Sequence, residues 1–365
     1  MKVALVHDFL VRFGGAERVL KVLSEMYPEA PIFTLFYDEK RVGQFFDKER
    51  IRASRLQKLP RFMRKRYRIF VKSFPRLMEE FDFEDYDLVI SSNTAYSHGI
   101  VTALDTKHLC YCHSPMRYAW DWTNEYREEN GVRGLKAALY APLLKGLREW
   151  DMVAADRPDL YVANSENVRG RIRKYYKQEA KVIYPPIDVK RFRVSESHEG
   201  YFLILSSLTP YKKIDLAVQL FNKIGRKLVI IGEGPDRARL EEIAGDNIDF
   251  LGFKDDDTVR EYMENCRALI FPGEEDFGMT PVEAMACGKP VLAYGKGGLT
   301  ETVISGKTGE FFFEPNVESM EDGLARLLAN ERFYRPRAIR RHALQFSRDE
   351  FERKMRNAVA AVRRS

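Results

Sequence analysis

The sequence has few cysteines, and their placement excludes a protein held together by disulfides. Four cysteines in 365 residues are too few and too scattered for such a framework, so we expect a reducing compartment. Cys110 and Cys112 stand two positions apart inside an apolar run, which predicts a buried strand. A zinc site is disfavoured, because no second cysteine pair stands at zinc-ligand spacing.

Long apolar runs are also absent. No stretch reaches the roughly 18 uninterrupted apolar residues that a transmembrane helix needs. The apolar run at the N-terminus is interrupted by His7 and Asp8, which the apolar core of a signal peptide would not contain. We therefore expect a cytoplasmic protein that is soluble or at most bound to the surface of a membrane.

The charge balance shows no strong excess of either sign. Lys and Arg number 60 against 54 Asp and Glu, so the net charge is +6, which is mild and does not predict nucleic-acid binding. A hydrophobic fraction of 45% and a charged fraction of 31% are typical of soluble globular proteins, and the length favours two domains. A nicotinamide dehydrogenase is disfavoured, since no G-x-G-x-x-G follows the first apolar run.

Short apolar runs alternate with amphipathic segments along most of the chain, which predicts two α/β units. In the first unit the expected strands are residues 3–6, 31–36, 88–91, 108–112, 160–163 and 181–184. In the second unit they are residues 201–206, 227–231, 248–251, 268–271, 290–293 and 310–313. The clearest expected helices are residues 16–26, 165–176, 215–224, 236–244 and 258–266.

Strands that are almost entirely apolar suit parallel sheets covered by helices on both faces. We therefore predict two doubly wound, Rossmann-like α/β domains that face a central cleft. The first domain is expected at residues 1–190 and the second at residues 191–346, and a C-terminal helix at about 347–363 is expected to pack back on the first. Ligands of such sheets bind at the carboxyl ends of the strands.

One segment interrupts this pattern. Residues 51–78 contain ten Lys or Arg and no Asp or Glu, interleaved with apolar residues at partly helical spacing. Three interpretations stay open: a peripheral membrane surface for anionic lipid headgroups, a nucleic-acid patch, or a solvated helical face. No recognised nucleic-acid motif accompanies the segment, which counts against the second interpretation.

The stretch EEDFGMTPVE, residues 274–283, carries the clearest chemistry. It follows an expected strand, and we predict that a helix begins near Pro281 with Thr280 as its N-cap. The backbone N–H groups of Met279 and Thr280 then form an anion site suited to phosphate. Gly278 lets the backbone approach a ligand closely.

Two carboxylates, Glu275 and Glu283, flank this predicted anion site. Ionised carboxylates only accept hydrogen bonds, so they suit a hydroxyl-rich ligand such as a ribose or a hexose. A molecule with hydroxyls at both ends and phosphate between them is a sugar nucleotide. Taken alone, the two residues have a second interpretation, namely an ordinary loop charge and a carboxylate in the first turn of a helix.

The spacing E-x7-E, with Phe277 and Gly278 inside it, resembles the motif of the family 4 glycosyltransferases, which are retaining enzymes of the two-domain GT-B fold. Further stretches resemble the family's motifs in the family's order: residues 9–18 with Gly14 and Gly15, then residues 209–215, 231–235, 286–291, 297–301 and 307–310. The resemblance covers nearly the whole chain. It implies an N-terminal domain on the acceptor side and a C-terminal domain that binds the nucleotide-sugar donor.

The resemblance also implies roles for individual residues. Lys212 would neutralise the leaving diphosphate, Glu275 would hold hydroxyls of the transferred sugar, and His113 would contact that sugar. These three are the expected catalytic residues. The expected donor-binding residues are Gly14, Gly15, Lys213, Phe277, Gly278, Met279, Thr280 and Glu283, the last on the ribose hydroxyls. No metal and no cofactor are expected.

One position departs from the family. Five positions before the loop lysine the family usually has Arg, and this sequence has Ser207. Serine cannot replace the charged, bidentate contact of Arg with phosphate. Either Lys213 or an arginine elsewhere, such as Arg12, compensates, or the donor phosphate is held more weakly.

Within the family, residues 111–121 resemble mannosyltransferases that build lipopolysaccharide O-antigen and related surface polysaccharides from GDP-mannose. We therefore expect transfer of mannose onto a lipid-linked saccharide or polysaccharide acceptor at the inner face of the cell membrane. Residues 51–78 would make the peripheral membrane contact, and no nucleic-acid partner is expected. A UDP-sugar-dependent enzyme of the same fold is the alternative, and a sugar-nucleotide epimerase or a non-catalytic basic binding protein stays open outside this class.

Overall fold

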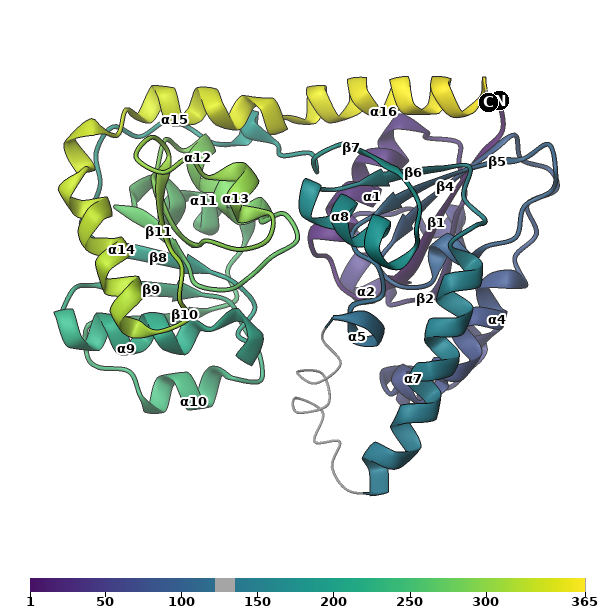
Figure 1. Ribbon diagram of the computed structural model, residues 1–365, viewed down its shortest axis with the longest axis horizontal. Coiled ribbons are helices and arrows are strands. Elements are labelled where there is room, and N and C mark those ends of the chain that lie inside the picture. The colour runs from purple at the N-terminus through teal and green to yellow at the C-terminus, as the bar shows by residue number, and fades with distance from the viewer. Residues whose placement is uncertain (122–134, 365) are drawn as a thin grey trace. The chain divides into compact units, whose positions relative to one another are not determined.

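Two α/β units make up the chain in a computed structural model, which describes residues 1–121 and 135–364 (Figure 1). The side chains at positions 61, 65, 68 and 135–140 lie outside this description. Unit 1 consists of Met1–Pro186 and Phe351–Ser365, and unit 2 consists of Ile187–Glu350. Each unit holds one parallel sheet packed against helices, which confirms the predicted fold of two doubly wound domains.

Unit 1 contains a seven-stranded sheet in the order β3-β2-β1-β4-β5-β6-β7, and all neighbouring strands are parallel. The strands are β1 Val3–Leu10, β2 Ile32–Tyr37, β3 Ile51–Ala53, β4 Leu88–Asn93, β5 Lys107–Cys112, β6 Leu160–Ala163 and β7 Ala180–Val182. Every strand expected in this unit is present, and the edge strand β3 adds to the prediction. It leaves no periodic pattern in the sequence, because only Ile51 of its three residues is buried.

Helices cover both faces of this sheet. They are α1 Gly15–Met26, α2 Glu39–Val42, α3 Arg61–Lys65, α4 Phe74–Glu79, α5 Arg117–Trp120, α7 Leu135–Ala154, α8 Glu166–Tyr175 and α16 Arg348–Val362. Along β1, Val3 and Leu5 face the core that α1 and α16 cover, whereas Ala4 and Val6 face the core beneath α4 and α7. This alternation is typical of a strand buried on both faces.

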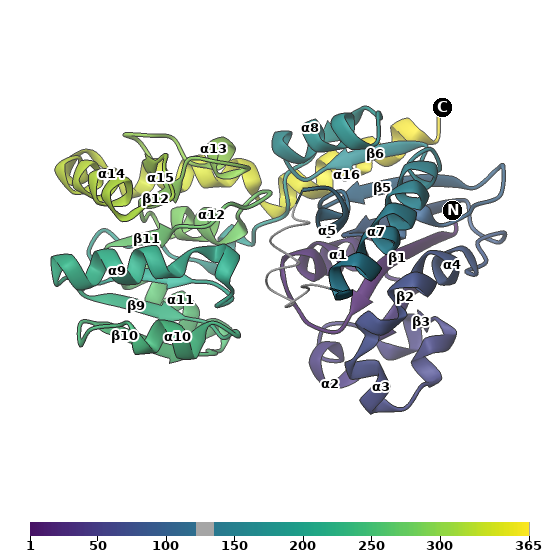
Figure 2. The ribbon, with the colours of Figure 1, turned by 60° about the horizontal axis from the view of Figure 1, so that its bottom comes forward.

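Unit 2 contains a six-stranded parallel sheet in the order β10-β9-β8-β11-β12-β13. Its strands are β8 Phe202–Leu205, β9 Leu228–Ile231, β10 Ile248–Gly252, β11 Ala268–Phe271, β12 Val291–Tyr294 and β13 Gly309–Phe312. Its helices are α9 Ile214–Ile224, α10 Arg237–Glu242, α11 Asp256–Asn265, α12 Met279–Ala286, α13 Leu299–Thr302, α14 Val317–Ala329 and α15 Pro336–Ala343. Helix α9 packs beside α10 and α14, and α12 packs beside α13 and α15 (Figure 2).

The strand order of each sheet reverses at one place. The reversal lies between β1 and β4 in unit 1 and between β8 and β11 in unit 2. At such a reversal the loops after the two strands leave toward opposite faces of the sheet, and ligands bind in the crevice between those loops. The loops after β1 and β4, and those after β8 and β11, are therefore where a site is expected.

Candidate functional site

Lys212 and Glu275 meet at the carboxyl ends of the adjacent strands β8 and β11 in unit 2, where their side chains form an ion pair. Lys212 ends the 3-10 turn Pro210–Lys212 that follows β8, and its side chain is largely buried. Its Nζ lies 5.0 Å from the ring centroid of Tyr211 and 5.8 Å from that of Phe271. The cation is thus placed against two aromatic rings that limit its contact with water, and its charge acts more strongly on a ligand there.

The Lys212 side chain lies in a narrow crevice that leaves no room for a water molecule. It is lined by Ile204, Ser206, Lys212, Ile214, Ile270, Phe271, Pro272 and Gly273. These residues belong to the ends of β8 and β11, to the loops that follow them and to the start of α9. The crevice therefore lies at the strand-order reversal of unit 2, where such sheets bind ligands.

The backbone of Glu275 is held by the loop that follows β12. Gly298 donates its N–H to the Glu275 carbonyl at 2.8 Å, and Gly297 pairs with Glu275 in an isolated parallel bridge. A Cβ at position 298 would lie 2.2 Å from the carbonyl oxygen of Asp276, so only glycine allows this approach. The motif at residues 297–301 was recognised in the sequence, but only the structure shows that it fixes the Glu275 loop.

Helix α12 begins earlier than predicted. Its N-cap is Gly278, at φ 84°, so the prediction of Thr280 as the N-cap is wrong. This left-handed backbone favours glycine, and it starts the helix at Met279 and moves Pro281 from the first helical position to the third. Met279 and Thr280 remain half-buried in the first turn, where a helix favours an anion.

Glu283 and Phe277 are both buried near the start of this helix, Glu283 within the helix and Phe277 in the loop before it. Glu283 lies one turn into α12 and its side chain is mostly buried. Phe277 is buried as well, and its ring packs edge-on against Phe346 with the centroids 5.6 Å apart. Phe277 therefore anchors the loop to the core of unit 2, and its contact with a donor stays a prediction.

Lys213 and Ser207 lie at the exposed rim of the β8 loop. Lys213 has a left-handed backbone, at φ 54°, at the N-cap of α9. Such a backbone is unfavourable for lysine, and residues held in this way cluster at functional sites. Ser207 is exposed, and Ser206 donates its hydroxyl to the Ser207 carbonyl at 3.2 Å. Arg12, the other residue expected to compensate for Ser207, is exposed in unit 1.

In unit 1, His113 lies directly after β5 and is buried. Its backbone N–H donates to the Asn93 carbonyl at 2.8 Å, and its carbonyl accepts from the Asn164 side-chain amide at 3.0 Å. Its ring Nε2 lies 2.9 Å from the hydroxyl of Ser92. Both the backbone and the ring of His113 are therefore held by residues of the neighbouring strands and their ends.

Ser92 connects His113 to His7 and Glu17. Ser92, His7 and Glu17 were not among the site residues expected from the sequence. His7 Nδ1 lies 2.9 Å from the Ser92 carbonyl and 3.1 Å from the Ser92 hydroxyl. His7 Nε2 lies 3.6 Å from Glu17 Oε1, and Glu17 Oε2 accepts the N–H of Gly14 at 2.8 Å. A continuous chain of polar groups thus joins the predicted residues Gly14 and His113 through the interior of unit 1.

The Gly14-Gly15 pair starts helix α1. Gly14 is the N-cap and Gly15 is the first helical residue. The bond from the Gly14 N–H to the Glu17 carboxylate is the backbone half of a capping box, which explains a glutamate three positions after the cap. Contact of the two glycines with a donor stays a prediction.

The charges of His7 and Glu17 stabilise each other. Burial alone would lower the pKa of His7, but the contact with Glu17 and the nearby Asp8 outweigh burial, so the pKa of His7 is raised. Burial alone would raise the pKa of Glu17, but His7 and Arg12 outweigh burial and lower that pKa. The sequence did carry a sign of this pair, since His7 and Asp8 interrupt an otherwise apolar strand.

Asp8 organises the loop that follows β4. Its buried carboxylate accepts the backbone N–H groups of residues 94–97 and the hydroxyl of Thr94, at 2.6 to 2.9 Å. A buried carboxylate satisfied by so many donors fixes the loop that supplies them. Asp8 therefore has a structural role at the strand-order reversal of unit 1.

The basic segment, residues 51–78, folds into β3, α3, α4 and the 3-10 turns Arg55–Lys58 and Tyr67–Ser73. Most of its apolar side chains pack on the core of unit 1. Phe62 and Ile69 do not, since 70% and 66% of their surfaces are exposed. They share the segment with exposed basic residues such as Arg66 and Lys72. Within residues 1–121 and 135–364, no helix has both the length and the apolar character needed to cross a membrane.

Two family models match the two halves of the chain. The model described as Glycosyltransferase Family 4 matches residues 13–191, which include Gly14 and His113. The model described as Glycosyl transferases group 1 matches residues 187–345, which include Lys212, Glu275 and Glu283. All the residues expected to act on a donor thus lie within the matched part of the chain.

Curated proteins similar to this chain carry the names of glycosyltransferases. An uncharacterized glycosyltransferase of Methanocaldococcus jannaschii is 29% identical over 205 residues, which cover 55% of this chain and 58% of that protein. An alpha-1,3/1,6-mannosyltransferase of Dictyostelium discoideum is 23% identical over 298 residues, which cover 68% of each. The chain therefore spans less than two thirds of the length of the first of these relatives.

Solved structures share the fold over nearly the whole chain. The Anabaena protein HepE in complex with UDP has a TM-score of 0.72 at 16% identity, over 99% of this chain and 100% of that one. Sucrose-phosphate synthase from Thermosynechococcus elongatus has a TM-score of 0.71 at 16% identity, over 98% and 99%. At these identities the likeness shows the fold alone, and that fold is the expected GT-B fold.

Proposed function

The chain belongs to the family 4, or group 1, glycosyltransferases, and we propose that it transfers the hexose of a nucleoside diphosphate hexose to an acceptor hydroxyl and releases the nucleoside diphosphate. The two family models together match residues 13–345. The observation that carries the proposal is the pairing of Lys212 with Glu275 at the strand-order reversal of unit 2. A cation suited to a diphosphate stands there beside an acceptor suited to sugar hydroxyls.

In this proposal each part of the donor has its own partner. Lys212 and the first turn of α12 hold the diphosphate, and Lys213 adds a second positive charge. Glu275 accepts hydrogen bonds from hydroxyls of the hexose, and Glu283 accepts them from the ribose. His113 contacts the hexose.

We propose that the transfer retains the configuration of the anomeric carbon. The acceptor oxygen forms its bond to that carbon on the face from which the diphosphate leaves, and the bond between the carbon and the phosphate oxygen breaks. The departing phosphate oxygen takes the proton of the acceptor hydroxyl. The protein contributes positioning and, through Lys212, stabilisation of the charge that develops on the diphosphate, and the proposal involves no metal and no cofactor.

We propose GDP-mannose as the donor. The support is the resemblance of residues 111–121 to O-antigen mannosyltransferases, together with the mannosyltransferase relative from D. discoideum. A UDP-sugar is the second candidate, because structures of HepE in complex with UDP and with UDP-glucose share this fold. The two candidates place the same diphosphate at Lys212 and differ in the base and the hexose.

The acceptor is proposed to be a lipid-linked saccharide at the inner face of the cell membrane. The support is the exposure of Phe62 and Ile69 among the basic residues of residues 51–78. Exposed apolar side chains enter the boundary between headgroups and acyl chains, while Lys and Arg attract anionic lipids.

Calorimetric titration with GDP, UDP and ADP tests the donor proposal, with Glu283→Ala measured alongside. GDP should bind selectively, and Glu283→Ala should weaken its binding at least about tenfold, the loss expected for hydrogen bonds to a charged group. Glu318→Ala, which removes an exposed carboxylate from the first turn of α14, is the matched control and should leave binding unchanged. Selective UDP binding would discard mannose, and binding of no nucleotide would contradict the proposed function.

A further inference from the structure

The buried polar groups that join Gly14 to His113 in unit 1 can be assigned as donors or acceptors from their chemistry. His7 faces an acceptor at each ring nitrogen: the Ser92 carbonyl lies 2.9 Å from Nδ1, and the Glu17 carboxylate lies 3.6 Å from Nε2. Carbonyl and carboxylate oxygens only accept, and a neutral imidazole has a single N–H. The surroundings of His7 therefore suit the imidazolium, which carries a proton on both nitrogens.

The protonated His7 determines the direction of the Ser92 hydroxyl. The Nδ1–H of His7 also lies next to Ser92 Oγ, at 3.1 Å, so this oxygen accepts from His7. Among the described contacts of Ser92 Oγ, His113 Nε2, at 2.9 Å, is the acceptor that remains for the proton of this hydroxyl, and we assign the proton there. A ring nitrogen that accepts a hydrogen bond carries no proton, so His113 is neutral and its proton is on Nδ1.

We propose that Ser92, oriented by His7 and Glu17, is a positioning residue that holds His113 as the neutral tautomer with its proton on Nδ1. The inference rests on the proposed function, in which His113 contacts the hexose of the donor. The His113 ring is buried and packs edge-on against the Tyr111 ring, with the centroids 5.1 Å apart, which restricts a rotation that would exchange its two nitrogens. The partner of one ring nitrogen thereby decides what the other nitrogen does.

The neighbouring titratable groups keep His7 protonated and Glu17 ionised. Burial opposes a charge on His7, but Glu17 on α1 and Asp8 on β1 raise its pKa beyond that effect. Burial also opposes a charge on Glu17, whose pKa is nevertheless lowered by His7 and Arg12. Between these two pKa values both His7 and Glu17 are charged, and the series of polar contacts from Gly14 to His113 is intact. It is lost above the raised pKa of His7, where the imidazolium gives up a proton, and below the lowered pKa of Glu17.

The opposite face of β4 carries a matched pair that lacks this connection. Ser91 Oγ lies 2.8 Å from His108 Nε2, and both residues are buried. Ser91 and Ser92 are adjacent residues of β4. An alanine substitution at either position removes one serine hydroxyl from this strand, and each removes a hydrogen-bond partner from a buried histidine ring. Of these two hydroxyls, that of Ser92 lies beside His113, whereas that of Ser91 lies beside His108.

Long-range ¹H–¹⁵N NMR spectra of the histidine side chains in the full chain test the inference without any substrate. The chain has six histidines, so His113→Gln and His7→Gln variants assign their signals. In the wild type we expect an unprotonated Nε2 and a protonated Nδ1 at His113 across roughly pH 6 to 8. In Ser92→Ala the His113 signals should become a pH-dependent mixture of forms, whereas Ser91→Ala should leave them unchanged.

Turnover of GDP-mannose, or of UDP-glucose, separates a positioning role from a purely structural one. We expect Ser92→Ala to lower kcat about tenfold with KM within about twofold, because the lost hydrogen bond positions a group that acts in the transition state. Ser91→Ala should change neither constant. If Ser92→Ala fails to fold, Glu17→Gln tests the same series of polar contacts. Without the Glu17 carboxylate, the His7 ring should carry a single proton.

A protonated Nε2 on His113 in the wild type would overturn the inference, and so would a Ser92→Ala spectrum identical to that of the wild type. A doubly protonated His7 in Glu17→Gln would also contradict the inference, because Glu17 would then not be what keeps His7 protonated. If the spectra follow the expectation but neither nucleotide sugar is turned over, the positioning inference stands and the proposed function fails.

Discussion

The Nζ of Lys212 contacts a carboxylate oxygen of Glu275, so the two charges expected to serve different parts of one donor neutralise each other. A donor that uses both must separate them. In the proposed function, the diphosphate of the donor would replace Glu275 at Lys212, and its hexose hydroxyls would replace Lys212 at Glu275. An exchange of partners keeps a counter-charge or hydrogen-bonding group at both side chains, whereas removal of Glu275 alone would take a counter-ion from the largely buried Lys212.

Glu275→Gln should therefore have opposite effects on nucleotide binding and on sugar transfer. Affinity for GDP, which has no hexose, should rise about fivefold, because an ion pair of this kind contributes on the order of 1 kcal/mol and no longer competes for Lys212. The rate of transfer should fall about 100-fold, because the hexose loses a charged acceptor in the transition state. Calorimetry with GDP and an assay with GDP-mannose measure the two effects, and Glu274→Gln is the neighbouring control. A loss of GDP affinity in Glu275→Gln would contradict the exchange.

Ser207→Arg should restore the charge that the family usually has at this position. We expect affinity for GDP to rise about tenfold, since Arg forms a charge-assisted, bidentate contact with phosphate. Ser207→Gln, which is long and polar but uncharged, is the control and should not reproduce the gain. Equal affinities in all three proteins would mean that another cation already fills this place.

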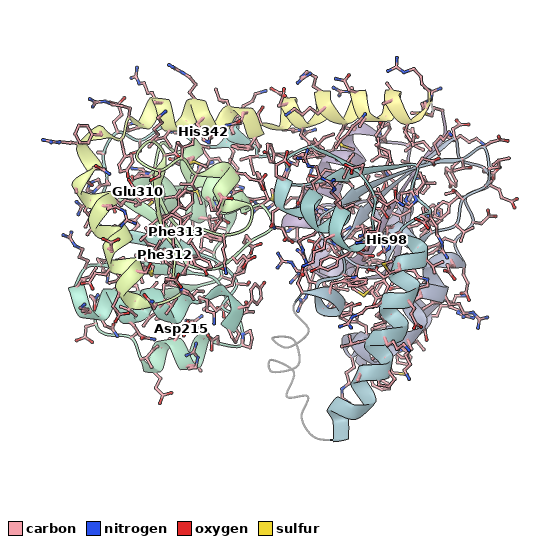
Figure 3. All side chains as sticks on the ribbon, in the orientation of Figure 1. His98, Asp215, Glu310, Phe312, Phe313 and His342 are labelled. Carbon is pink, nitrogen blue, oxygen red and sulfur yellow. The ribbon has the colours of Figure 1, made fainter. Side chains whose placement is uncertain are left out.

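His98 and Asp151 are fully buried in unit 1, where Figure 3 labels His98, and His98 Nε2 lies 3.3 Å from Asp151 Oδ1. Asp151 also accepts from Trp120 Nε1 at 2.7 Å and from the Tyr176 hydroxyl at 3.2 Å. Burial is the largest effect on both: it raises the pKa of Asp151 to about 7 and lowers the pKa of His98 to about 4. Between these pH values both side chains are neutral, so the pair is not an ion pair.

Asp151→Asn should therefore make stability less dependent on pH. In the unfolded chain Asp151 ionises near pH 3.8, but in the folded protein it ionises only near pH 7, so the wild type loses stability as the pH rises between these values. The variant cannot ionise and escapes that loss. Melting temperatures at pH 5 and pH 8 test this, with the exposed Asp156→Asn as the control. A constant difference between variant and wild type at both pH values would refute the assignment.

Phe62→Ser combined with Ile69→Ser should weaken binding to vesicles that contain anionic phospholipid. Each side chain is more than half exposed, and loss of its apolar contact with the bilayer should lower vesicle affinity at least about tenfold for the pair. Leu104→Ser is the control, because Leu104 is 96% exposed in unit 1 but lies outside the basic segment. Sedimentation with vesicles measures the binding, and equal binding of all three proteins would remove the membrane contact from the account.

The sheets were predictable because parallel strands buried on both faces leave short apolar runs in the sequence. The start of α12 was not predictable in the same way. Its N-cap depends on the left-handed backbone of Gly278, where a Cβ would lie 2.6 Å from Leu299 Cδ2. That constraint comes from a packing partner in another element, whereas the preference of Pro281 for a helix start is local.

The place of the candidate site in unit 2 could be predicted where one short motif supplies its residues, whose roles stay predictions. Glu275 and Glu283 lie in a single stretch, and the Lys212 loop precedes the next helix in a recognisable context. Ser92 was not predictable, because its contact with His7 depends on the register in which β1 pairs with β4. The apolar pattern of either strand alone does not set that register.

In the proposed function, Lys212 is the group that would hold the donor diphosphate, and transfer depends on it most directly. The measurement that tests it is the release of GDP from GDP-mannose, or of UDP from UDP-glucose, by the wild type, Lys212→Ala and the exposed-lysine control Lys307→Ala. We predict release by the wild type and the control, and release at least about 100-fold slower by Lys212→Ala. Equal release by all three proteins, or none by the wild type from either nucleotide sugar, would contradict the account.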